Sequence, residues 1–209
     1  MVKAFYDFQT TKLADYTGKL KSGDWCLGDK AYTRSGSSGS YTYTPLEKYN
    51  YSSRMVYDAS TRLERDNANG YQPTLKCNGT VLDKFATVSG VSIEAPMYVS
   101  AITADEIVYA GGIHLFSENK NYYLINDYQK SNFSDFWSLS PSGYFDGDDF
   151  AFSVYNRGYI ATDVLLNNHE FRPSIQLKSS IEISSGEGTL EKPYVIGWVT
   201  DTFDLGWPR

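Results

Sequence analysis

Hydrophobic residues recur along this chain with two different spacings, and the spacing changes near the middle. In residues 5–21, FYDFQTTKLADYTGKLK, the apolar positions with near-helical spacing are Phe5, Phe8, Leu13, Tyr16 and Leu20. This spacing predicts an amphipathic first helix, which GDWCLGDK at residues 23–30 ends in a turn. The Gly- and Ser-rich residues 34–40, RSGSSGS, predict a flexible surface loop. Between this loop and residue 100 the signals are weak and indicate short strands or coil, around RMVYDASTRL, PTLKCNG and VSIEAPMYV.

A second, short helix is predicted at residues 102–112, ITADEIVYAGG. Thr103 and Glu106 have the spacing of a capping box, in which each side chain bonds the backbone N–H of the other residue. The residues expected to form a hydrophobic staple and the helix stop are Ile102 with Ile107, and Gly111 with Gly112.

Strand-like segments replace the helical spacing in the second half of the chain. They are NYYLI (121–125), FWSLSP (136–141), DFAFSVY (149–155), GYIATDV (158–164), EFRPSIQLK (170–178), IEIS (181–184) and KPYVIGWV (192–199). The third segment alternates as a half-buried strand does, with Phe150, Phe152 and Val154 on one side and Ala151, Ser153 and Tyr155 on the other. The fifth segment alternates in the same way, with Phe171, Ile175 and Leu177 against Arg172, Ser174 and Gln176.

The segment YNRGY predicts a tight turn between two of these strands, because Gly158 can adopt a positive φ. Two early helices followed by a strand-rich, mainly antiparallel half predict an α+β fold. With 209 residues the chain is long enough for one well-buried domain, which we expect to cover residues 1–209.

The formal net charge of -6 argues against nucleic acid and membrane surfaces as partners, since it gives no diffuse attraction to phosphate backbones or anionic headgroups. Aromatic residues make up 16% of the chain, and 18 of them are tyrosines. Tyrosine offers a large rigid contact area with one polar atom, so this content is typical of a binding surface or of a Tyr-rich β-protein.

Cys26 and Cys77 are the only cysteines, and their spacing matches no metal motif. A disulfide between them would stabilise the fold by about 4 kcal/mol on the chain-entropy model, and two reduced core cysteines are the alternative. No apolar run reaches the roughly 20 residues that span a bilayer. The first residues, MVKAFYDFQTT, lack the apolar region of a signal peptide, so we expect the sequence to begin inside a longer natural chain.

The residue types needed for catalysis are scarce. A nucleophilic Ser or Cys needs a nearby base, and His114 and His169 are the only histidines. Neither a G-x-S-x-G elbow nor a phosphate-binding or dinucleotide motif is present. We expect His114 to be a structural or surface residue. His169, which lies among Asn167, Asn168 and Glu170, is either a ligand contact or a surface residue without a role.

An acidic run at residues 146–149, DGDD, has two interpretations. Asp146, Asp148 and Asp149 could supply oxygens for calcium, or they could form a solvated loop, because the run lacks the EF-hand pattern. Three asparagines fit the N-glycosylation sequon, which is common by chance: Asn50, Asn78 and Asn132.

The order of these segments resembles a known fold family. ITADEIVYAGG, FWSLSP, FSVYNRGYI and EFRPSIQLK together resemble the C-type-lectin-like fold of the formylglycine-generating-enzyme branch. DWCLGDK, TLKC and SGEGTLEKPYVI extend the resemblance to a group of gut-bacterial surface proteins and phage proteins. The match covers residues 20–197, and the order of the segments carries it rather than any single motif.

Members of this fold include the variable proteins of diversity-generating retroelements, in which adenine-directed mutagenesis rewrites codons ahead of a closing VRP strand. The resemblance implies a scaffold that consists of Trp137, Phe152, Val154, Gly158, Ile160, Val164, Phe171, Arg172 and Pro173. It implies a displayed, variable face within residues 138–173 that consists of Ser142, Tyr144, Phe145, Asp146, Asp148, Asp149, Tyr155, Asn156, Arg157, Tyr159, Thr162, Asp163, Asn167, Asn168 and His169.

The resemblance therefore implies a noncatalytic ligand-binding domain without a cofactor, located outside the cell, on its surface or on a phage virion. Its partner would be a protein or cell-surface ligand.

The sequence departs from the family at two places. Glu170 replaces the glycine of GVRP. Cys26 and Cys77 lie early in the chain, whereas the catalytic cysteines of formylglycine-generating enzymes lie late. The alternative is a carbohydrate-binding domain with a fixed ligand, assisted by calcium at the acidic run. We expect no enzyme, because no nucleophile, base and orienting group can be assembled.

Overall fold

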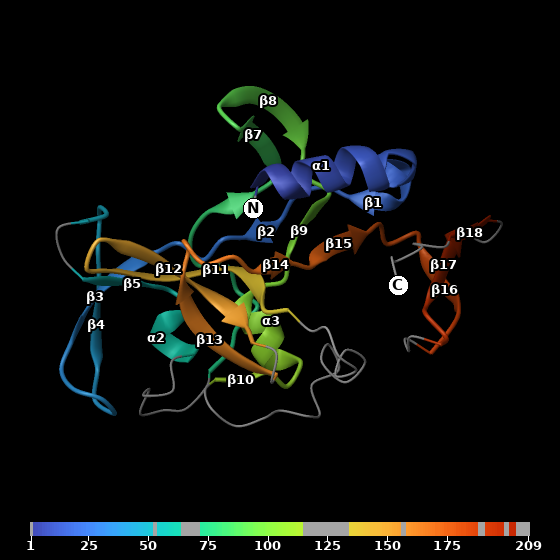
Figure 1. The fold of residues 1–209 in the computed structure, drawn as a ribbon. Coiled ribbons are helices and arrows are strands. Elements are labelled where there is room, and N and C mark those ends of the chain that lie inside the picture. Colours follow the sequence, from blue (N-terminus) through green and yellow to red (C-terminus); the bar gives the residue numbers. More distant parts are fainter. Residues whose placement is uncertain are drawn as a thin grey trace.

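The structure is a computed structural model that describes residues 2–51, 54–63, 72–114, 134–155, 158–187, 191–198 and 201–203. Figure 1 shows a broad sheet in the middle of the view, with α2 (Ser60–Leu63) and α3 (Ala104–Tyr109) below it and α1 (Val2–Lys12) above it. The C-terminal strands form a separate small sheet at one side.

The first helix is shorter than its apolar spacing predicts. α1 ends at Lys12, the 3-10 helix η1 (Ala14–Lys19) follows, and β1 (Leu20–Lys21) begins at Leu20. Leu20 pairs with Leu177, so hydrogen bonds across a sheet replace those of a helix at this point. The apolar spacing nevertheless identified the side that faces the core, because its buried members are Phe5, Leu13 and Leu20.

The predicted second helix is confirmed as α3, together with both of its ends. Thr103 Oγ1 accepts from the backbone N–H of Glu106 at 3.2 Å, and Glu106 Oε2 accepts from the backbone N–H of Thr103 at 2.8 Å, which completes the capping box. At the other end Gly111 has a φ of 98°, and the Gly112 N–H bonds the Ile107 carbonyl at 2.8 Å. A side chain at Gly112 would lie 2.6 Å from Ile107 Cγ2, so glycine is required there.

The central sheet joins both halves of the chain. Its strand order is β10-β13-β12-β11-β5-β3-β4, with β14 paired to β11. The bounds are β3 Ala31–Ser35, β4 Thr42–Pro45, β5 Met55–Tyr57, β10 Ile113–His114, β11 Phe136–Phe145, β12 Asp148–Val154, β13 Tyr159–Val164 and β14 Glu170–Phe171. The β10–β13 and β11–β14 pairs are parallel, and the other pairs are antiparallel. The predicted surface loop is found at residues 36–41 between β3 and β4, whereas Arg34 and Ser35, which were predicted to belong to it, lie in β3.

Four smaller sheets surround the central one. They have the orders β1-β15-β9, β2-β6, β7-β8 and β16-β17-β18. The bounds are β2 Trp25–Cys26, β6 Val81–Leu82, β7 Lys84–Val88, β8 Val91–Pro96, β9 Val99–Ala101, β15 Pro173–Leu177, β16 Glu182–Ser185, β17 Val195–Trp198 and β18 Asp201–Phe203. The predicted strands at residues 170–178, 181–184 and 192–199 thus correspond to β14 with β15, to β16 and to β17, whereas NYYLI lies outside the described residues.

Two hydrophobic clusters form most of the core. One lies around α1, β9 and β15 and includes Phe5, Leu13 and Phe85. The other lies between the central sheet and the helices α2 and α3, and includes Phe136 and Phe152. The partly buried Phe171, Ile175 and Leu177 pack against the first cluster, as their alternation predicts.

Strand β12 is covered on both sides, which differs from the half-buried strand that its alternation predicts. All four residues from 151 to 154 are buried. Phe152 and Val154 belong to the cluster above α2 and α3. On the other side Ala151 and Ser153 are buried as well. The alternation therefore identified the two sides of the strand but not the cover on the second side.

The described residues form a mixed α+β structure with few helices and mostly antiparallel sheets, which confirms the predicted class at this level. Within the part of the chain that the structure describes, no helix has both the length and the apolar character needed to cross a membrane.

Candidate ligand-binding face

The strand pair β12–β13 positions the centre of the predicted face. In its register Ala151 opposes Asp163 and Phe152 opposes Thr162. Opposed residues of an antiparallel pair share one side of the sheet, so Asp163 lies on the side away from Phe152 and the core below it. The turn that follows β12 is closed by the Gly158 N–H, which bonds the Tyr155 carbonyl at 2.9 Å, and Gly158 has the expected positive φ of 84°.

Four groups converge on the Asp163 carboxylate. Oδ1 accepts from the Val164 backbone N–H and from Asn167 Nδ2, both at 2.8 Å. Oδ2 accepts from the Tyr155 hydroxyl at 3.1 Å and lies 2.8 Å from His169 Nε2. We call Asp163 and the side chains of Tyr155, Tyr159, Asn167 and His169 the Asp163 cluster. It joins the end of β13 to the turn at residues 165–169.

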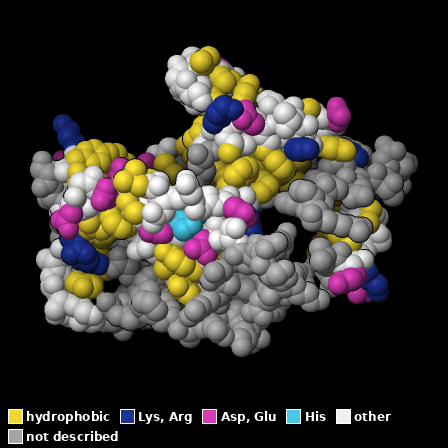
Figure 2. Space-filling model, in the orientation of Figure 1, with side chains coloured by type: hydrophobic (Ala, Val, Ile, Leu, Met, Phe, Trp, Pro, Cys, Tyr) yellow, Lys and Arg dark blue, Asp and Glu magenta, His cyan; other side chains and the backbone are white. Residues whose placement is uncertain are grey.

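Aromatic rings pack beside this carboxylate. The Tyr155 and Tyr159 rings are stacked, with centroids 5.1 Å apart and an interplanar angle of 9°. The His169 ring packs edge-on against Trp137 of β11, with centroids 4.3 Å apart. On the face drawn in Figure 2, a histidine side chain lies among acidic side chains and next to hydrophobic ones. The face thus combines ring surface with fixed hydrogen-bonding groups.

The protonation of this cluster follows from its contacts. Burial alone would raise the pKa of Asp163, but the hydrogen bonds from Asn167, His169, Val164 and Tyr155 outweigh it and lower the pKa. Burial, together with the neighbouring Asp163 charge, raises the pKa of Tyr155 to about 12. At neutral pH the carboxylate is therefore an anion that accepts, and the Tyr155 hydroxyl is a donor.

Two predicted members of the face make their ring contacts with another part of the molecule. The Tyr144 ring lies 5.2 Å from that of Tyr51, and the Phe145 ring lies 5.4 Å from that of Phe150. The guanidinium of Arg54 lies 4.3 Å from the Phe145 ring centroid. Tyr144 and Phe145 therefore belong to an aromatic region next to β5 rather than to the Asp163 cluster.

The acidic run forms the turn between β11 and β12. Asp146 and Gly147 have φ values of 52° and 97°, and the flanking residues Phe145 and Asp148 pair with each other. Two central residues with positive φ are typical of a two-residue type I′ hairpin turn, for which Asp-Gly is a favoured sequence. Asp148 and Asp149 are exposed beside it. Among the described residues, no group of three or more His, Cys, Asp and Glu side chains could hold a metal ion.

The displayed face expected from the resemblance needs corrections. Ser142 is fully buried and accepts from Ser60 Oγ at its carbonyl, at 2.8 Å, so its expected display is wrong. Thr162 faces the core side with Phe152. The His169 side chain is 7% exposed, because Trp137 and Asp163 cover it. The sequence gives no sign of these contacts, since they depend on neighbouring strands.

The remaining positions divide by exposure. The exposed members of the predicted face are Asp146, Asp148, Asp149, Asn167 and Asn168. The half-buried members are Tyr144, Phe145, Tyr155, Tyr159, Thr162 and Asp163. Asn156 and Arg157 lie outside the described residues, as does the sequon at Asn132. The scaffold positions Phe152, Val154 and Ile160 are fully buried, as expected.

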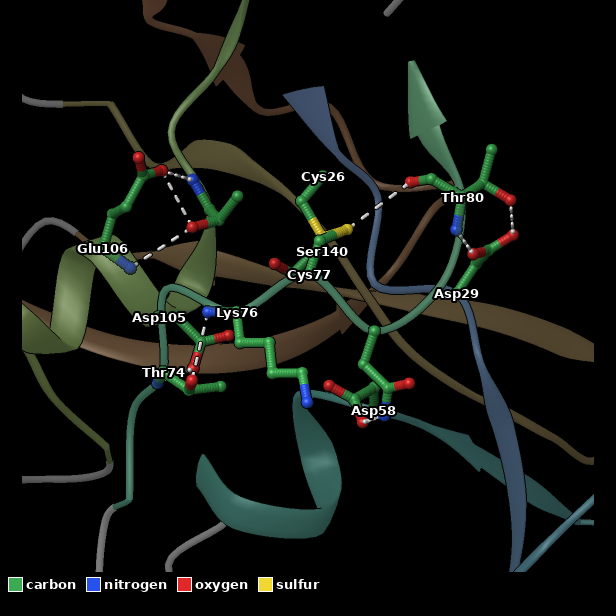
Figure 3. Close-up of a disulfide and its surroundings, with 12 residues drawn as sticks. Cys26, Asp29, Asp58, Thr74, Lys76, Cys77, Thr80, Asp105, Glu106 and Ser140 are labelled. Carbon is green, nitrogen blue, oxygen red and sulfur yellow. Dashed lines mark hydrogen bonds between the residues drawn. A yellow bond between two sulfur atoms is a disulfide. The ribbon is translucent and has the colours of Figure 1, made fainter. Parts of the chain in front are cut away.

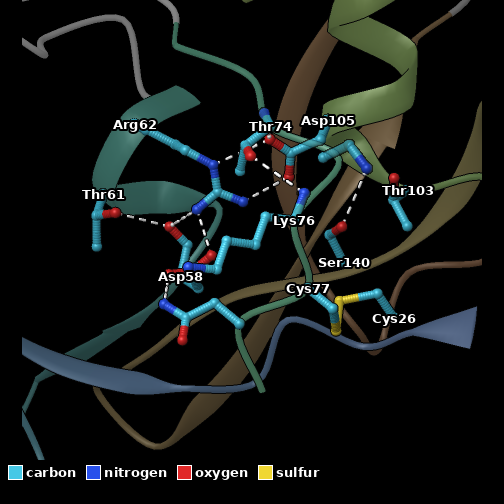
Figure 4. Close-up of polar contacts among 12 residues, drawn as sticks. Cys26, Asp58, Thr61, Arg62, Thr74, Lys76, Cys77, Thr103, Asp105 and Ser140 are labelled. Atoms are coloured by element: carbon cyan, nitrogen blue, oxygen red, sulfur yellow. Dashed lines mark hydrogen bonds and ion pairs between the residues drawn. A yellow bond between two sulfur atoms is a disulfide. The ribbon is translucent and has the colours of Figure 1, made fainter. Parts of the chain in front are cut away.

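A second polar cluster, which the sequence did not indicate, surrounds Arg62 of α2. Its guanidinium donates to Asp105 Oδ1 at 2.9 Å and to Asp105 Oδ2 at 2.6 Å, and it also pairs with the carboxylate of Asp58 (Figure 4). We call these three residues the Arg62 cluster. The side chains of Asp58 and Asp105 are 6% and 9% exposed, so both charges are nearly buried. Every carboxylate oxygen in it accepts at least one hydrogen bond.

A disulfide fastens the loop that covers this cluster. Cys26 of β2 and Cys77 are bonded, which decides between the two alternatives for the cysteines (Figure 3). Cys77 lies in residues 72–80, which we call the strap. From the strap, the Thr74 N–H donates to Asp105 at 2.8 Å and Asn78 Nδ2 donates to Asp58 at 2.6 Å. A pocket of about 200 Å³ lies between the strap and α2. The Asn78 amide is thus engaged inside the fold.

Family models, curated proteins and solved structures give no match to this chain.

Proposed function

We propose that this chain is a noncatalytic ligand-binding domain that recognises a protein or cell-surface ligand through the turn beside the Asp163 cluster. The observation that carries the proposal is the convergence of the stacked Tyr155 and Tyr159 rings and the Asn167 amide at the Asp163 carboxylate, next to an exposed turn. Tyrosine and asparagine supply rigid contact area and directional hydrogen bonds, which are the two needs of a recognition surface.

The division of labour along β12 and β13 supports this proposal. Phe152, Val154 and Ile160 are fully buried and belong to one hydrophobic cluster. Asn167 and Asn168 follow β13 in an exposed turn, next to Leu165 and Leu166, which are 50% and 82% exposed. Burial of exposed leucine by a partner is favourable, at roughly 25 cal/mol per Å² of apolar surface. Because the side chains of residues 165–168 are exposed and lie outside this hydrophobic cluster, the fold does not depend on their burial.

A noncatalytic role agrees with the way His169 is used. Its Nε2 lies 2.8 Å from Asp163 Oδ2, its ring packs on Trp137, and its side chain is 7% exposed. A general base needs a free nitrogen within reach of the substrate proton. Here Nε2 faces Asp163, Nδ1 lies 3.9 Å from Asp135 Oδ2, and Trp137 covers the ring, so the geometry favours a positioning role for His169.

We further propose that the domain has the C-type-lectin-like fold and that a diversity-generating retroelement varies its exposed positions. Asn167 and Asn168 are the residue types that adenine-directed mutagenesis yields, and they follow β13 ahead of EFRP. Asp163 and His169 would be retained, because each is tied to several neighbours. The Cys26–Cys77 disulfide supports a location outside the cell, on its surface or on a virion, since disulfides persist in oxidising environments.

Two experiments test the proposal. The DNA around the gene should contain a near-identical copy of the segment for residues 138–173 that differs at adenines, next to a reverse-transcriptase gene. In a display library that varies residues 165–168, most members should fold and selection should yield binders to unrelated proteins. A library in which most members fail to fold would contradict the proposed recognition surface, and a gene without the repeat would contradict its diversification.

A further inference from the structure

A groove of about 510 Å³ lies between the β3–β4 hairpin and the end of the strap. It is lined by Asp29, Leu46 and Tyr49, and by Gly79 and Thr80 at the end of the strap. None of these residues belongs to the Asp163 cluster or to the predicted displayed face. The volume falls in the range of about 300–1,000 Å³ that is typical of small-molecule sites.

The Asp29 carboxylate is held rigidly in this groove. Oδ1 accepts from the Thr80 N–H at 2.6 Å, and Oδ2 accepts from Thr80 Oγ1 at 2.9 Å and from the Tyr49 hydroxyl at 3.0 Å. Burial alone would raise the pKa of Asp29, but these hydrogen bonds lower it overall, so the group is an anion at neutral pH. A side chain at Gly79 would lie 2.4 Å from Asp29 Oδ1, so only glycine permits this approach.

The charges that line the groove balance. Asp29 and Glu47 are negative, and Lys30 and Lys48 are positive. A phosphate or a cationic side chain would meet a like charge in such a groove, whereas a neutral ligand would not. A hydroxyl group both donates and accepts, so it can bridge a carboxylate and an ammonium group at the same time. The lining therefore favours a neutral ligand rich in hydroxyl groups.

A row of tyrosine rings continues from the groove. The Tyr49 ring lies 6.1 Å from that of Tyr57 and 6.2 Å from that of Tyr51, and Tyr51 lies 5.2 Å from Tyr144. Tyr49 and Tyr51 are 48% and 55% exposed. Exposed tyrosine rings offer an apolar surface with a polar edge, which suits a ligand that has both C–H faces and hydroxyl groups. An extended ligand could contact more than one of these rings.

We propose that this groove and the adjoining tyrosines form a binding site for neutral oligosaccharides, separate from the Asp163 cluster and independent of calcium. Independence from calcium follows from the two lysines that line the groove and from the donors that already occupy the Asp29 oxygens. The site does not rest on the proposed function, because it shares no residue with the Asp163 cluster or with the turn at residues 165–168; of the predicted displayed face it includes only Tyr144.

The test is a titration of the full chain with neutral oligosaccharides. The gluco-, manno-, galacto- and chito-oligosaccharide series are used, and saturation-transfer NMR detects the binding. We expect binding to at least one series, with affinity that rises with chain length because of the tyrosine row. Tyr49→Ala should weaken this binding at least tenfold. Addition of EDTA should leave the affinity unchanged.

Matched variants separate a lost site from a lost fold. Tyr109→Ala removes another tyrosine, 59% exposed at the end of α3, and should leave the affinity unchanged. Tyr49→Phe keeps the ring and removes the bond to Asp29, so it should cost less affinity than Tyr49→Ala. The melting temperature of each variant shows whether it is folded. The proposal is overturned if no series binds at millimolar concentration, if EDTA abolishes binding, or if Tyr49→Ala and Tyr109→Ala behave alike.

Discussion

Asp105 in the Arg62 cluster and Asp163 in the Asp163 cluster are both aspartates that accept several hydrogen bonds, but their partners come from different distances along the chain. Asp105 binds Arg62 and Thr74, which are 43 and 31 residues away. The partners of Asp163 all lie within eight residues of it. The Arg62 cluster therefore ties separate segments of the fold together, whereas the Asp163 cluster shapes one local turn.

Exposure follows the same division. The Asp105 side chain is 9% exposed and lies under the strap. The Asp163 side chain is 18% exposed and lies next to the turn that contains the exposed Asn167 and Asn168. A nearly buried charge such as Asp105 is costly without a partner, whereas a charge that keeps more contact with water is partly solvated. The comparison teaches that a dense polar network can join distant segments or fix one local turn, and that the sequence distance of its contacts distinguishes the two.

The largest expected effect comes from breaking the Arg62 cluster. Asp105→Ala leaves Arg62 Nε, Arg62 Nη2 and the Thr74 N–H without their acceptors in a nearly buried site, although Asp58 still pairs with Arg62. The free energy of unfolding should therefore fall by about 3–5 kcal/mol. Urea denaturation measures this change. The control is Glu187→Gln, which breaks an exposed pair with Lys192 and should cost less than about 1 kcal/mol. Equal effects of the two substitutions would contradict a structural role for the cluster.

Removal of the disulfide should have an effect of similar size. Cys26 and Cys77 are 51 residues apart, and a cross-link over a loop of this length is worth about 4 kcal/mol on the chain-entropy model. The double substitution of both cysteines by serine should lower the free energy of unfolding by about this amount. The strap should also become cleavable by protease at low enzyme concentration. An unchanged protease pattern would show that the strap contacts hold without the disulfide.

The pH dependence of stability should distinguish Asp163 from a neutral residue. Its folded pKa is lowered below the unfolded value of about 3.9, so its contribution to stability is full above that pH and is lost as the pH falls through the folded pKa. Asp163→Asn should therefore destabilise the fold at pH 6 by about 1 kcal/mol, because it weakens the hydrogen bonds to the carboxylate, and by less at pH 3. A difference between wild type and variant that is the same at both pH values would contradict this assignment.

The smallest effect is expected at the exposed turn of the proposed recognition surface. Asn168→Ser and Leu166→Ser replace exposed side chains, so each should change the free energy of unfolding by less than about 0.5 kcal/mol and the melting temperature by about 1–2 °C. Differential scanning calorimetry measures both. A loss of several degrees would mean that the turn supports the fold and would contradict its role as an exchangeable surface.

Local patterns in the sequence were sufficient where the interactions are local. The capping box of α3, its glycine stop and the turn at Gly158 all involve residues within a few positions of one another, and each was predicted correctly. The α+β class and the strands β11 to β15 followed from the spacing of apolar residues, because that spacing reports which side of an element faces the core.

Tertiary structure alone decided the features that depend on distant residues. Leu20 lies in a strand rather than in the first helix because it pairs with Leu177, and Ser142 is buried where it contacts Ser60. The Arg62 cluster joins residues 58, 62 and 105 with the strap, and nothing in their spacing indicates it. The sequence by itself determined the class, the local caps and turns, and the apolar side of the first helix and of strands β12 and β15, since these arise from neighbours along the chain. Long-range contacts arise only when the folded chain brings separate segments together.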